Sequence, residues 1–133
     1  MRVADIMHTT LETIGPDQTV AEAVVTLAEQ HVSGLPVVEG RNRLVGVISM
    51  SDVLQLLSDS ADSERRGEIL DSTLVRDVMT AKPVTVDPDL DVHDAARQML
   101  YREIHRVFVE YEGVLVGVLS QSDIVGAVAG ARL

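Results

Sequence analysis

Hydrophobic and polar residues follow the same order twice along this chain. In each half a short extended segment, at 11–14 and 83–86, leads into a turn rich in proline and aspartate. Apolar residues then recur at the spacing i, i+3, i+4, i+7 and i+8, which predicts an amphipathic helix with one buried face. The helical positions are Val20, Ala23, Val24, Leu27 and Ala28 in the first half and Val92, Ala95, Ala96, Met99 and Leu100 in the second.

Polar residues mark the start of each predicted helix. Thr19 and Glu22 fit the Thr-x-x-Glu capping box, and Asp91 takes the capping position in the second half. After each helix, two strand-like runs are separated by a polar loop that contains glycine, which predicts a β-hairpin. The runs are 35–38 with 44–49 and 107–110 with 115–120, and a second helix is predicted after each hairpin, at 52–57 and 123–129.

The two halves are copies of one sequence unit. At an offset of 72 residues, Val-Ala-Asp-Ile-Met at 3–7 falls on Val-Arg-Asp-Val-Met at 75–79, and nine positions between 3 and 38 are identical. The offset falls to 71 after the hairpin loop, where LVGVISMSDVLQLL at 44–57 matches LVGVLSQSDIVGAV at 115–128 with seven identities. A change of length is expected in a turn, so the chain is interpreted as a tandem repeat.

The repeat predicts the domain organisation. The first unit is placed at 1–57 and the second at 74–133, and the charged, serine-rich segment 58–73 between them is interpreted as a surface linker. An isolated unit of about 60 residues buries only a modest share of its surface. We therefore expect the two copies to pack on each other and complete one core as a single domain.

The charge and composition exclude several classes of function. A formal net charge of -10 opposes the approach of a phosphate polymer, so nucleic acid is not the expected direct partner. The absence of cysteine excludes disulfides, thiolate zinc sites and cysteine nucleophiles. No run approaches the roughly 18 apolar residues that span a bilayer, and the N-terminus has no apolar signal core. We therefore expect a cytoplasmic protein without a membrane span.

The side chains show no pattern that predicts catalysis. No serine is placed with a histidine and an aspartate in a relay, so we expect a protein that is not an enzyme. His8, His31 and His93 lack the paired spacing of metal ligands and are interpreted as surface residues. No metal site is expected.

One family shares this order of strand, helix, strand, strand, helix. The chain resembles the cystathionine-β-synthase (CBS) domain pair, or Bateman module, in this order of elements and in three motifs. The motifs are Gly-Val-Ile-Ser-Met-Ser-Asp at 46–52, Gly-Val-Leu-Ser-Gln-Ser-Asp at 117–123 and Val-Ser-Gly-Leu-Pro-Val-Val at 32–38. The resemblance covers almost the whole chain and implies an α+β (mixed α/β) fold, in which two β-α-β-β-α repeats pack with pseudo-twofold symmetry. Ile-His-Arg at 104–106, with Ser-Gln-Ser-Asp at 120–123, is locally similar to the nucleotide-sensing regulatory subunits of AMP-activated protein kinase.

The resemblance implies two sites for an adenine nucleotide, AMP, ADP or ATP, in the cleft between the repeats. The site on the first repeat would use Ser49, Ser51 and Asp52 with Lys82, Ile104 and His105. The site on the second repeat would use Ser120, Ser122 and Asp123 with Thr10, Val32, Ser33 and Arg106.

The chemistry of the Ser-x-Ser-Asp run fits this role. Hydroxyls and free backbone N–H groups at a helix start attract anions, and a carboxylate accepts hydrogen bonds from both hydroxyls of a ribose. Arg106 has Gly34 as its repeat counterpart, so we predict that the Asp123 site, with the only guanidinium, binds more tightly. A structural interpretation stays open beside this one: Ser-x-Ser-Asp is also an ordinary helix cap, and Arg106 can pair with Glu103 or Glu110.

The ligand and the function each leave a second hypothesis open. NAD or S-adenosylmethionine is the alternative ligand, and a scaffolding or dimerisation module without a ligand is the alternative function. His105 fits a plain strand edge equally well, and Met7 and Met79 are interpreted as core fillers rather than ligand contacts.

Protein partners are expected under either function. A nucleotide sensor implies a regulated partner protein, whose identity the residues do not specify. A homodimer is expected as well, because the second helices carry more apolar residues than one small core needs: Leu54, Leu57, Ile124, Val125 and Val128.

Overall fold

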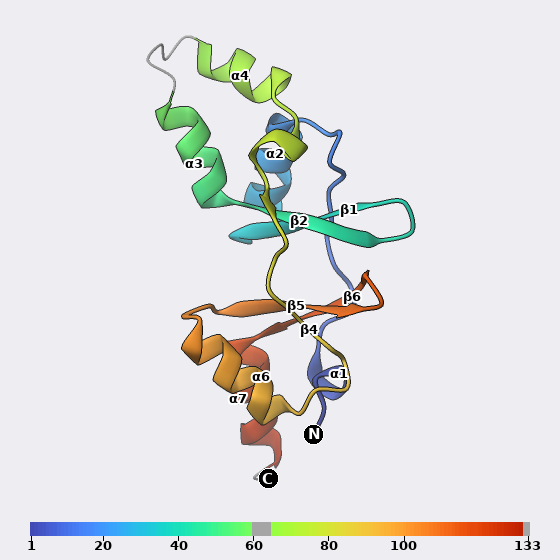
Figure 1. The fold of residues 1–133 in the computed structure, drawn as a ribbon. Helices are drawn as coiled ribbons and strands as arrows, with labels where there is room; N and C mark the ends of the chain where they lie inside the picture. The colour runs from blue at the N-terminus through green and yellow to red at the C-terminus, as the bar shows by residue number, and fades with distance from the viewer. Residues whose placement is uncertain (60–64, 132–133) are drawn as a thin grey trace. The chain divides into compact units, whose positions relative to one another are not determined.

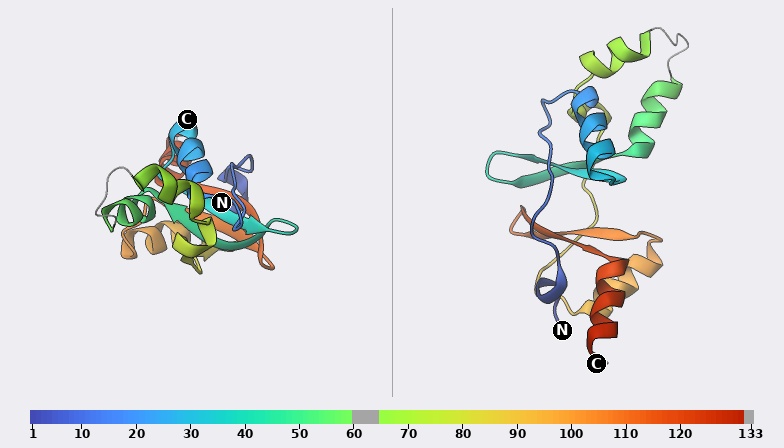
Figure 2. Two further views of the ribbon diagram at one scale, coloured as in Figure 1. Left: turned by 90° about the horizontal axis from the view of Figure 1, so that it is seen from above. Right: turned by 180° about the vertical axis from the view of Figure 1, so that it is seen from behind.

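The computed structural model describes residues 1–59 and 65–131, and the chain forms two compact units. One unit is Glu12–Pro83, and the other combines Met1–Leu11 with Val84–Leu133. In each unit, helices cover one face of a small β-sheet (Figure 1 and Figure 2). The mixed α/β class and the two repeats predicted from the sequence are confirmed.

The unit Glu12–Pro83 is built on the hairpin of the first repeat. β1 (Gly34–Glu39) pairs antiparallel with β2 (Arg43–Ser49), and β2 also pairs antiparallel with β3 (Thr80–Ala81). Within the predicted extended segment 11–14, Ile14 makes a bridge parallel to Val37. The helices of this unit are α2 (Val20–Gln30), α3 (Met50–Ser58), α4 (Arg66–Ser72) and α5 (Val75–Val78).

The other unit repeats this plan with the second copy. β5 (Arg106–Tyr111) pairs antiparallel with β6 (Val114–Ser120), and β4 (Thr85–Val86) pairs parallel with β5. Both predicted hairpins are therefore confirmed, and their strands extend one residue further at the loop. The helices of this unit are α1 (Val3–Ile6), α6 (Val92–Tyr101) and α7 (Gln121–Ala131).

The predicted capping residues begin the long helices. Thr19 Oγ1 accepts a hydrogen bond from the backbone N–H of Glu22 at 3.2 Å, and Asp91 Oδ1 accepts one from the backbone N–H of His93 at 2.8 Å. The carboxylate of Glu22 accepts a hydrogen bond from Gln18 Nε2 at 2.6 Å, in place of the bond that would complete the capping box. A single side-chain acceptor is enough to satisfy one of the free N–H groups of the first turn.

Each repeat begins with a leading segment that packs in the unit of the other repeat. The first leading segment, residues 1–11, packs in the unit of the second repeat: Val3 N donates to Leu90 O before α6, and His8 exchanges two backbone hydrogen bonds of 2.9 Å with Val118 of β6. The second leading segment, residues 74–83, joins the first hairpin through the pairing of β3 with β2. The compact units therefore divide the chain differently from the sequence repeats, with the leading segments exchanged.

A glycine in each hairpin makes room for the leading segment. A Cβ built on Gly46 would lie 2.7 Å from Met79 Sδ, and one on Gly117 would lie 2.6 Å from Met7 Sδ. Each would also lie 2.9 Å from a backbone carbonyl oxygen, of Thr80 or of His8. Both methionines are partly buried against the apolar cluster of their unit, as expected for core fillers.

Apolar side chains form a separate buried cluster in each unit. The cluster of the unit Glu12–Pro83 includes Val20, Leu35 and Ile48, and that of the other unit includes Met99 and Leu119. Each unit therefore buries its own sheet and helices, and the expectation that the two copies pack on each other as a single domain stays a prediction. The exchanged leading segments supply further apolar contacts to each hairpin, which enlarges both clusters.

The segment interpreted as a linker contains a helix. Arg66–Ser72 form α4, whose Leu70 is packed against the apolar cluster of the unit Glu12–Pro83. The linker predicted at 58–73 thus has regular structure over 66–72, and residues 60–64 lie outside the described part of the chain. The charged residues around Leu70 conceal this helix, because one turn of apolar periodicity is too little to recognise.

Candidate functional site

The Ser-x-Ser-Asp run of the first repeat forms the start of α3. Helix α3 begins at Met50, two residues before the predicted start, and Ser49 is its N-cap. Ser49 Oγ accepts from the backbone N–H of Asp52 at 3.2 Å, and Asp52 Oδ2 accepts from the backbone N–H of Ser49 at 2.8 Å. This reciprocal capping box fixes the position of the Asp52 carboxylate.

The second repeat has the same arrangement at the start of α7. The backbone N–H of Asp123 donates to Ser120 Oγ at 3.1 Å, and the backbone N–H of Ser120 donates to Asp123 Oδ2 at 2.8 Å. The first serine and the aspartate of each run therefore act as a helix cap, as the structural interpretation predicts. One carboxylate oxygen of each aspartate is used in this way, which leaves Oδ1 for other contacts.

The remaining carboxylate oxygen faces the leading segment of the same unit. Asp123 Oδ1 lies 2.6 Å from His8 Nε2, and Asp52 Oδ1 accepts a long hydrogen bond of 3.4 Å from Thr80 Oγ1. His8 and Thr80 are repeat counterparts, because both directly follow the Asp-x-Met motif. The side chain of Asp123 is 12% exposed while that of His8 is 68% exposed, so the carboxylate is largely covered and the imidazole is open to solvent.

The other predicted polar residues lie at the surface near these helix starts. The second serines, Ser51 and Ser122, are exposed in the first turn of α3 and α7. Thr10 and Lys82 are exposed in the leading segments, each in the same unit as the aspartate it is assigned to. Lys82 has a left-handed backbone with a φ of 55°, which is costly for a residue with a Cβ and marks a locally strained position.

The structure links Ser33 and His105 to the helix starts of their own units. Met50 N donates to Ser33 O at 2.9 Å, and Gln121 N donates to His105 O at 3.0 Å. Arg106, half-buried in β5, is paired with Ser120 of β6 in the strand register. The assignment of Val32 and Ser33 to the Asp123 site, and of Ile104 and His105 to the Asp52 site, joins residues of different units and stays a prediction.

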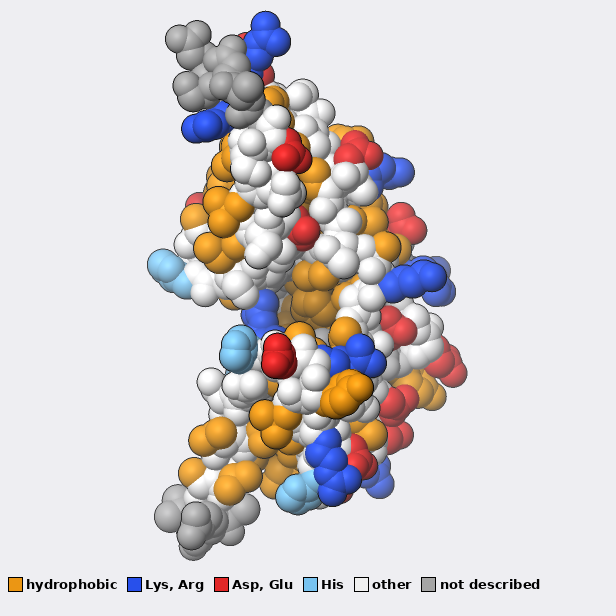
Figure 3. All heavy atoms as spheres, turned by 60° about the vertical axis from the view of Figure 1, so that its left-hand side comes forward, with side chains coloured by type: hydrophobic (Ala, Val, Ile, Leu, Met, Phe, Trp, Pro, Cys, Tyr) orange, Lys and Arg blue, Asp and Glu red, His pale blue; other side chains and the backbone are white. Residues whose placement is uncertain are grey.

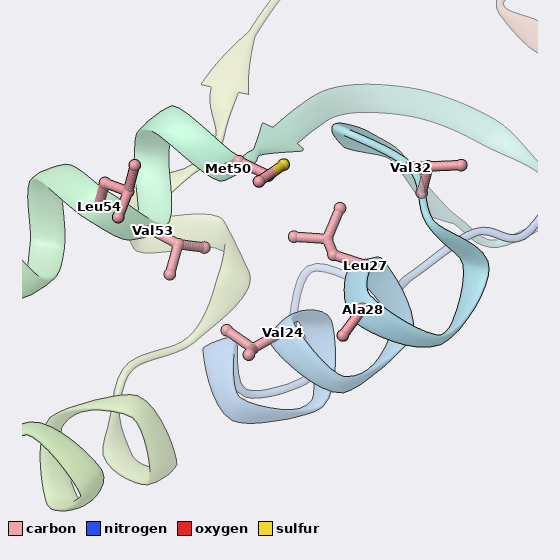
Figure 4. A pocket seen from close by; sticks show the side chains of 7 residues that line it. All are labelled: Val24, Leu27, Ala28, Val32, Met50, Val53 and Leu54. Atoms are coloured by element: carbon pink, nitrogen blue, oxygen red, sulfur yellow. The ribbon is translucent and has the colours of Figure 1, made fainter.

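Val32 and Ile104 contribute their side chains to apolar contacts. Val32 is partly buried against the cluster of its unit, and Ile104 against that of the other. Val32 also lines an apolar pocket of about 230 Å³ between α2 and α3, with Met50, Val53 and Leu54 on the α3 side (Figure 4).

A similar pocket of about 270 Å³ lies between α6 and α7. Its lining is apolar apart from His93, and the lining of the pocket between α2 and α3 is apolar throughout. A nucleotide needs several placed polar groups to fix its orientation. The helix starts, rather than these pockets, are therefore the better candidates for a nucleotide site.

Reasoning from the sequence missed His8 and Thr80 as candidate site residues. The interpretation of His8 as a surface residue agrees with its exposure, but His8 also contacts the Asp123 carboxylate. The two residues are not identical between the repeats, so a search for identities passes over them. Their common position after Asp-x-Met was the signal available in the sequence.

Metal clusters and membrane spans are both missing from the described part of the chain. Across residues 1–59 and 65–131, no three His, Cys, Asp or Glu side chains gather in a way that would hold a metal ion. Over the same ranges, no helix has both the length and the apolar character needed to cross a bilayer.

Both sequence repeats match a known protein-family model. The CBS domain model matches residues 3–59 and 75–130. The chain belongs to the CBS-domain family. Its two matches coincide with the two sequence repeats, so the chain carries a CBS-domain pair.

Several relatives of this CBS-domain pair have known sequences or structures. CBSX2 of Arabidopsis thaliana is 32% identical over 88% of this chain and 58% of CBSX2. A crystal structure of CBSX2 in complex with AMP covers 99% of this chain and 98% of that chain, at 30% identity and a TM-score of 0.83. MJ1225 of Methanocaldococcus jannaschii is 31% identical over 92% of this chain and 41% of MJ1225.

A more distant structure shows the shared fold alone. The CBS domain pair of MJ0100, in complex with 5′-methylthioadenosine and S-adenosyl-L-methionine, is 23% identical with a TM-score of 0.77 over 98% of each chain. The chain spans about half the length of the curated relatives it matches.

Proposed function

We propose that this CBS-domain pair is a regulatory, non-catalytic module that binds AMP, ADP or ATP and changes the activity of a partner protein. The observation that carries the proposal is the pair of fixed carboxylates, Asp52 and Asp123, each with one oxygen in a helix cap and the other turned toward a leading segment. The AMP complex of CBSX2 supports an adenine nucleotide as the class of ligand.

The fixed carboxylates suit the ribose of a nucleotide. Each carboxylate has about four acceptor positions, and the cap uses only some of them. The neighbouring hydroxyls of a ribose can donate to the positions that remain, and hydrogen bonds to an ionised acceptor are strong. A phosphate would be repelled by the same charge. We therefore assign Asp52 and Asp123 to the ribose.

The phosphate is assigned to hydroxyls, free N–H groups and basic side chains. Ser51 and Ser122 are exposed in the first turns of α3 and α7, where backbone N–H groups lack helical partners. Lys82 supplies an ammonium group in the unit of Asp52, and Arg106 supplies a guanidinium in the unit of Asp123. Thr10, Val32, Ser33, Ile104 and His105 remain predicted contacts.

A thermal-shift panel tests the nucleotide proposal against the alternatives. At a concentration about a hundredfold over its dissociation constant, a ligand that binds only the folded protein stabilises it by about 2.7 kcal/mol. We expect AMP, ADP or ATP to raise the melting temperature by several degrees. A rise with NAD or S-adenosylmethionine alone would change the ligand, and no rise with any member of the panel would favour a scaffolding module.

We also propose that the module forms a homodimer through its second helices. Hydrophobic side chains gather at the surface of each unit (Figure 3), and Leu54, Val125 and Val128 are more than half exposed. Leu57 and Ile124, which are predicted to join this surface, instead pack against the clusters of their own units. Three of the five predicted residues are thus available for pairing.

A charge on this surface is expected to separate the dimer. Leu54→Asp places a carboxylate where the proposed interface excludes water, which costs several kcal/mol unless the charge is paired. The mass in solution, measured by light scattering during gel filtration, should fall to that of one chain. Gln55→Asp adds the same charge at the next, exposed position of α3 and should leave the mass unchanged. A wild-type protein that is already monomeric would contradict the proposal.

A further inference from the structure

We propose that His8 sets the affinity of the Asp123 site for a nucleotide, because it occupies the carboxylate oxygen that the ribose needs. The inference rests on the nucleotide-binding function proposed above, and it adds a specificity-determining residue to one of the two sites. His8 belongs to the leading segment of the first repeat, 115 residues before the aspartate that it contacts.

The contact between His8 and Asp123 is short, and hydrogen bonds hold both residues in place. His8 Nε2 lies 2.6 Å from Asp123 Oδ1, and the backbone of His8 is held by two hydrogen bonds of 2.9 Å to Val118. The carboxylate is held by the Ser120 N–H on its other oxygen. The backbone of His8 and the carboxylate are therefore both held, and the imidazole takes an acceptor position on Oδ1 that a ribose hydroxyl would otherwise use.

The repeat provides an internal comparison. Thr80, the counterpart of His8, contacts Asp52 Oδ1 at 3.4 Å through a small neutral hydroxyl. A hydrogen bond of that length is weak and is given up easily. The Asp52 site is therefore open to a ribose in a way that the Asp123 site is not. This difference acts against Arg106, which favours phosphate binding in the unit of Asp123.

Three of the elements next to His8 carry charged residues: α1, β5 and α7. Strand β6, which pairs with the backbone of His8, has no titratable residue in its sequence, and α7 contributes Asp123. In α1, Asp5 accepts a hydrogen bond from the backbone N–H of Arg2. On the neighbouring strand β5, Arg106 and Glu110 are charged. Of these charged groups, Asp123 is the one whose side chain lies within hydrogen-bond distance of the His8 imidazole.

The experiment measures AMP binding by calorimetry in variants in which one of the two sites has been removed by mutation. Asp52→Ala leaves the Asp123 site, and in that background His8→Thr is expected to tighten AMP binding by about three- to tenfold. Asp123→Ala leaves the Asp52 site, and there the reciprocal change Thr80→His is expected to weaken AMP binding by a similar factor. Threonine is the residue that the repeat itself uses after Asp-x-Met, so His8→Thr is compatible with the backbone.

One control separates competition for the carboxylate from other effects. 2′,3′-Dideoxy-AMP lacks the hydroxyls that compete with His8, so His8→Thr should leave its dissociation constant unchanged.

The outcomes distinguish this inference from the proposed function. AMP binding that is unchanged or weakened by His8→Thr overturns the inference but not the nucleotide site, as does an equal gain for AMP and its dideoxy analogue. If no nucleotide binds to the wild-type protein or to any variant, the proposed function fails and the inference fails with it.

Discussion

Gly117→Ala is expected to destabilise the protein by about 1 to 3 kcal/mol, although it adds a single methyl group. The new Cβ would lie 2.6 Å from Met7 Sδ and 2.9 Å from the carbonyl oxygen of His8. The sulfur belongs to a flexible side chain and can move, but the carbonyl belongs to a backbone that is held by Val118. The leading segment must therefore shift away from β6, or the strand must distort.

Gly46→Ala is expected to have a similar cost for the same reason, since its Cβ would lie 2.7 Å from Met79 Sδ and 2.9 Å from Thr80 O. Urea denaturation, followed by circular dichroism, measures the free energy of unfolding for each variant. Gly126→Ala is the matched control, because it adds the same methyl group in α7 with no atom within 4 Å. Alanine is the better helix former, so this variant should gain about 0.4 to 1 kcal/mol.

The expectation is contradicted if the free energy of unfolding of Gly117→Ala is unchanged or higher, as we expect for Gly126→Ala. The leading segment would then tolerate a Cβ at position 117. The result also bears on the site, because a displaced leading segment carries His8 or Thr80 away from its aspartate. The glycines are therefore structural residues whose replacement we expect to alter both candidate sites.

Asp123→Asn is expected to weaken AMP binding by roughly ten- to a hundredfold while the fold is kept, because hydrogen bonds to a charged group contribute about 1.5 to 3 kcal/mol. The amide oxygen can still accept the hydrogen bond from Ser120 N, so the start of α7 can be preserved. The amide nitrogen cannot accept from a ribose hydroxyl. Calorimetric titration with AMP measures the loss.

Asp52→Asn should cause a smaller loss, because the unit of Asp52 has Gly34 where the other unit has Arg106. Asp91→Asn is the matched control: it makes the same change at the start of α6, outside the proposed sites, and asparagine caps a helix as well as aspartate. Equal losses for Asp52→Asn and Asp123→Asn would contradict the predicted inequality of the sites. A loss for Asp91→Asn would show that the changes act through stability.

Much of the local structure could be predicted from the sequence. The stripe of apolar residues after Thr19 and after Asp91 specified two helices together with their caps, since periodicity and capping depend on residues within one or two turns. The hairpins followed from apolar runs around glycine-containing loops. The Ser-x-Ser-Asp runs fit both candidate ligand groups and helix caps, and the structure shows the caps.

Helix α4 and the glycines that contact Met7 and Met79 could not be predicted from the sequence. Leu70 packs against the apolar cluster from within a charged segment, so the periodicity of α4 is hidden. The sequence predicts the two methionines in the core but does not identify the glycines that receive them. The residues around each glycine, Gly-Val-x-Ser, do not indicate which side chain will pack against it, because that side chain comes from a distant part of the chain.

The sequence by itself determined the duplication, the order of elements in each copy, the family and the serine–aspartate pairs at the starts of α3 and α7. Only the tertiary structure decided that the leading segments exchange between repeats, so that His8 meets Asp123 and Thr80 meets Asp52. The physical reason is that hydrogen bonding and hydrophobic periodicity are repeated equally in both copies. Either leading segment fits either hairpin by pattern alone, and the choice depends on contacts between residues far apart in the chain.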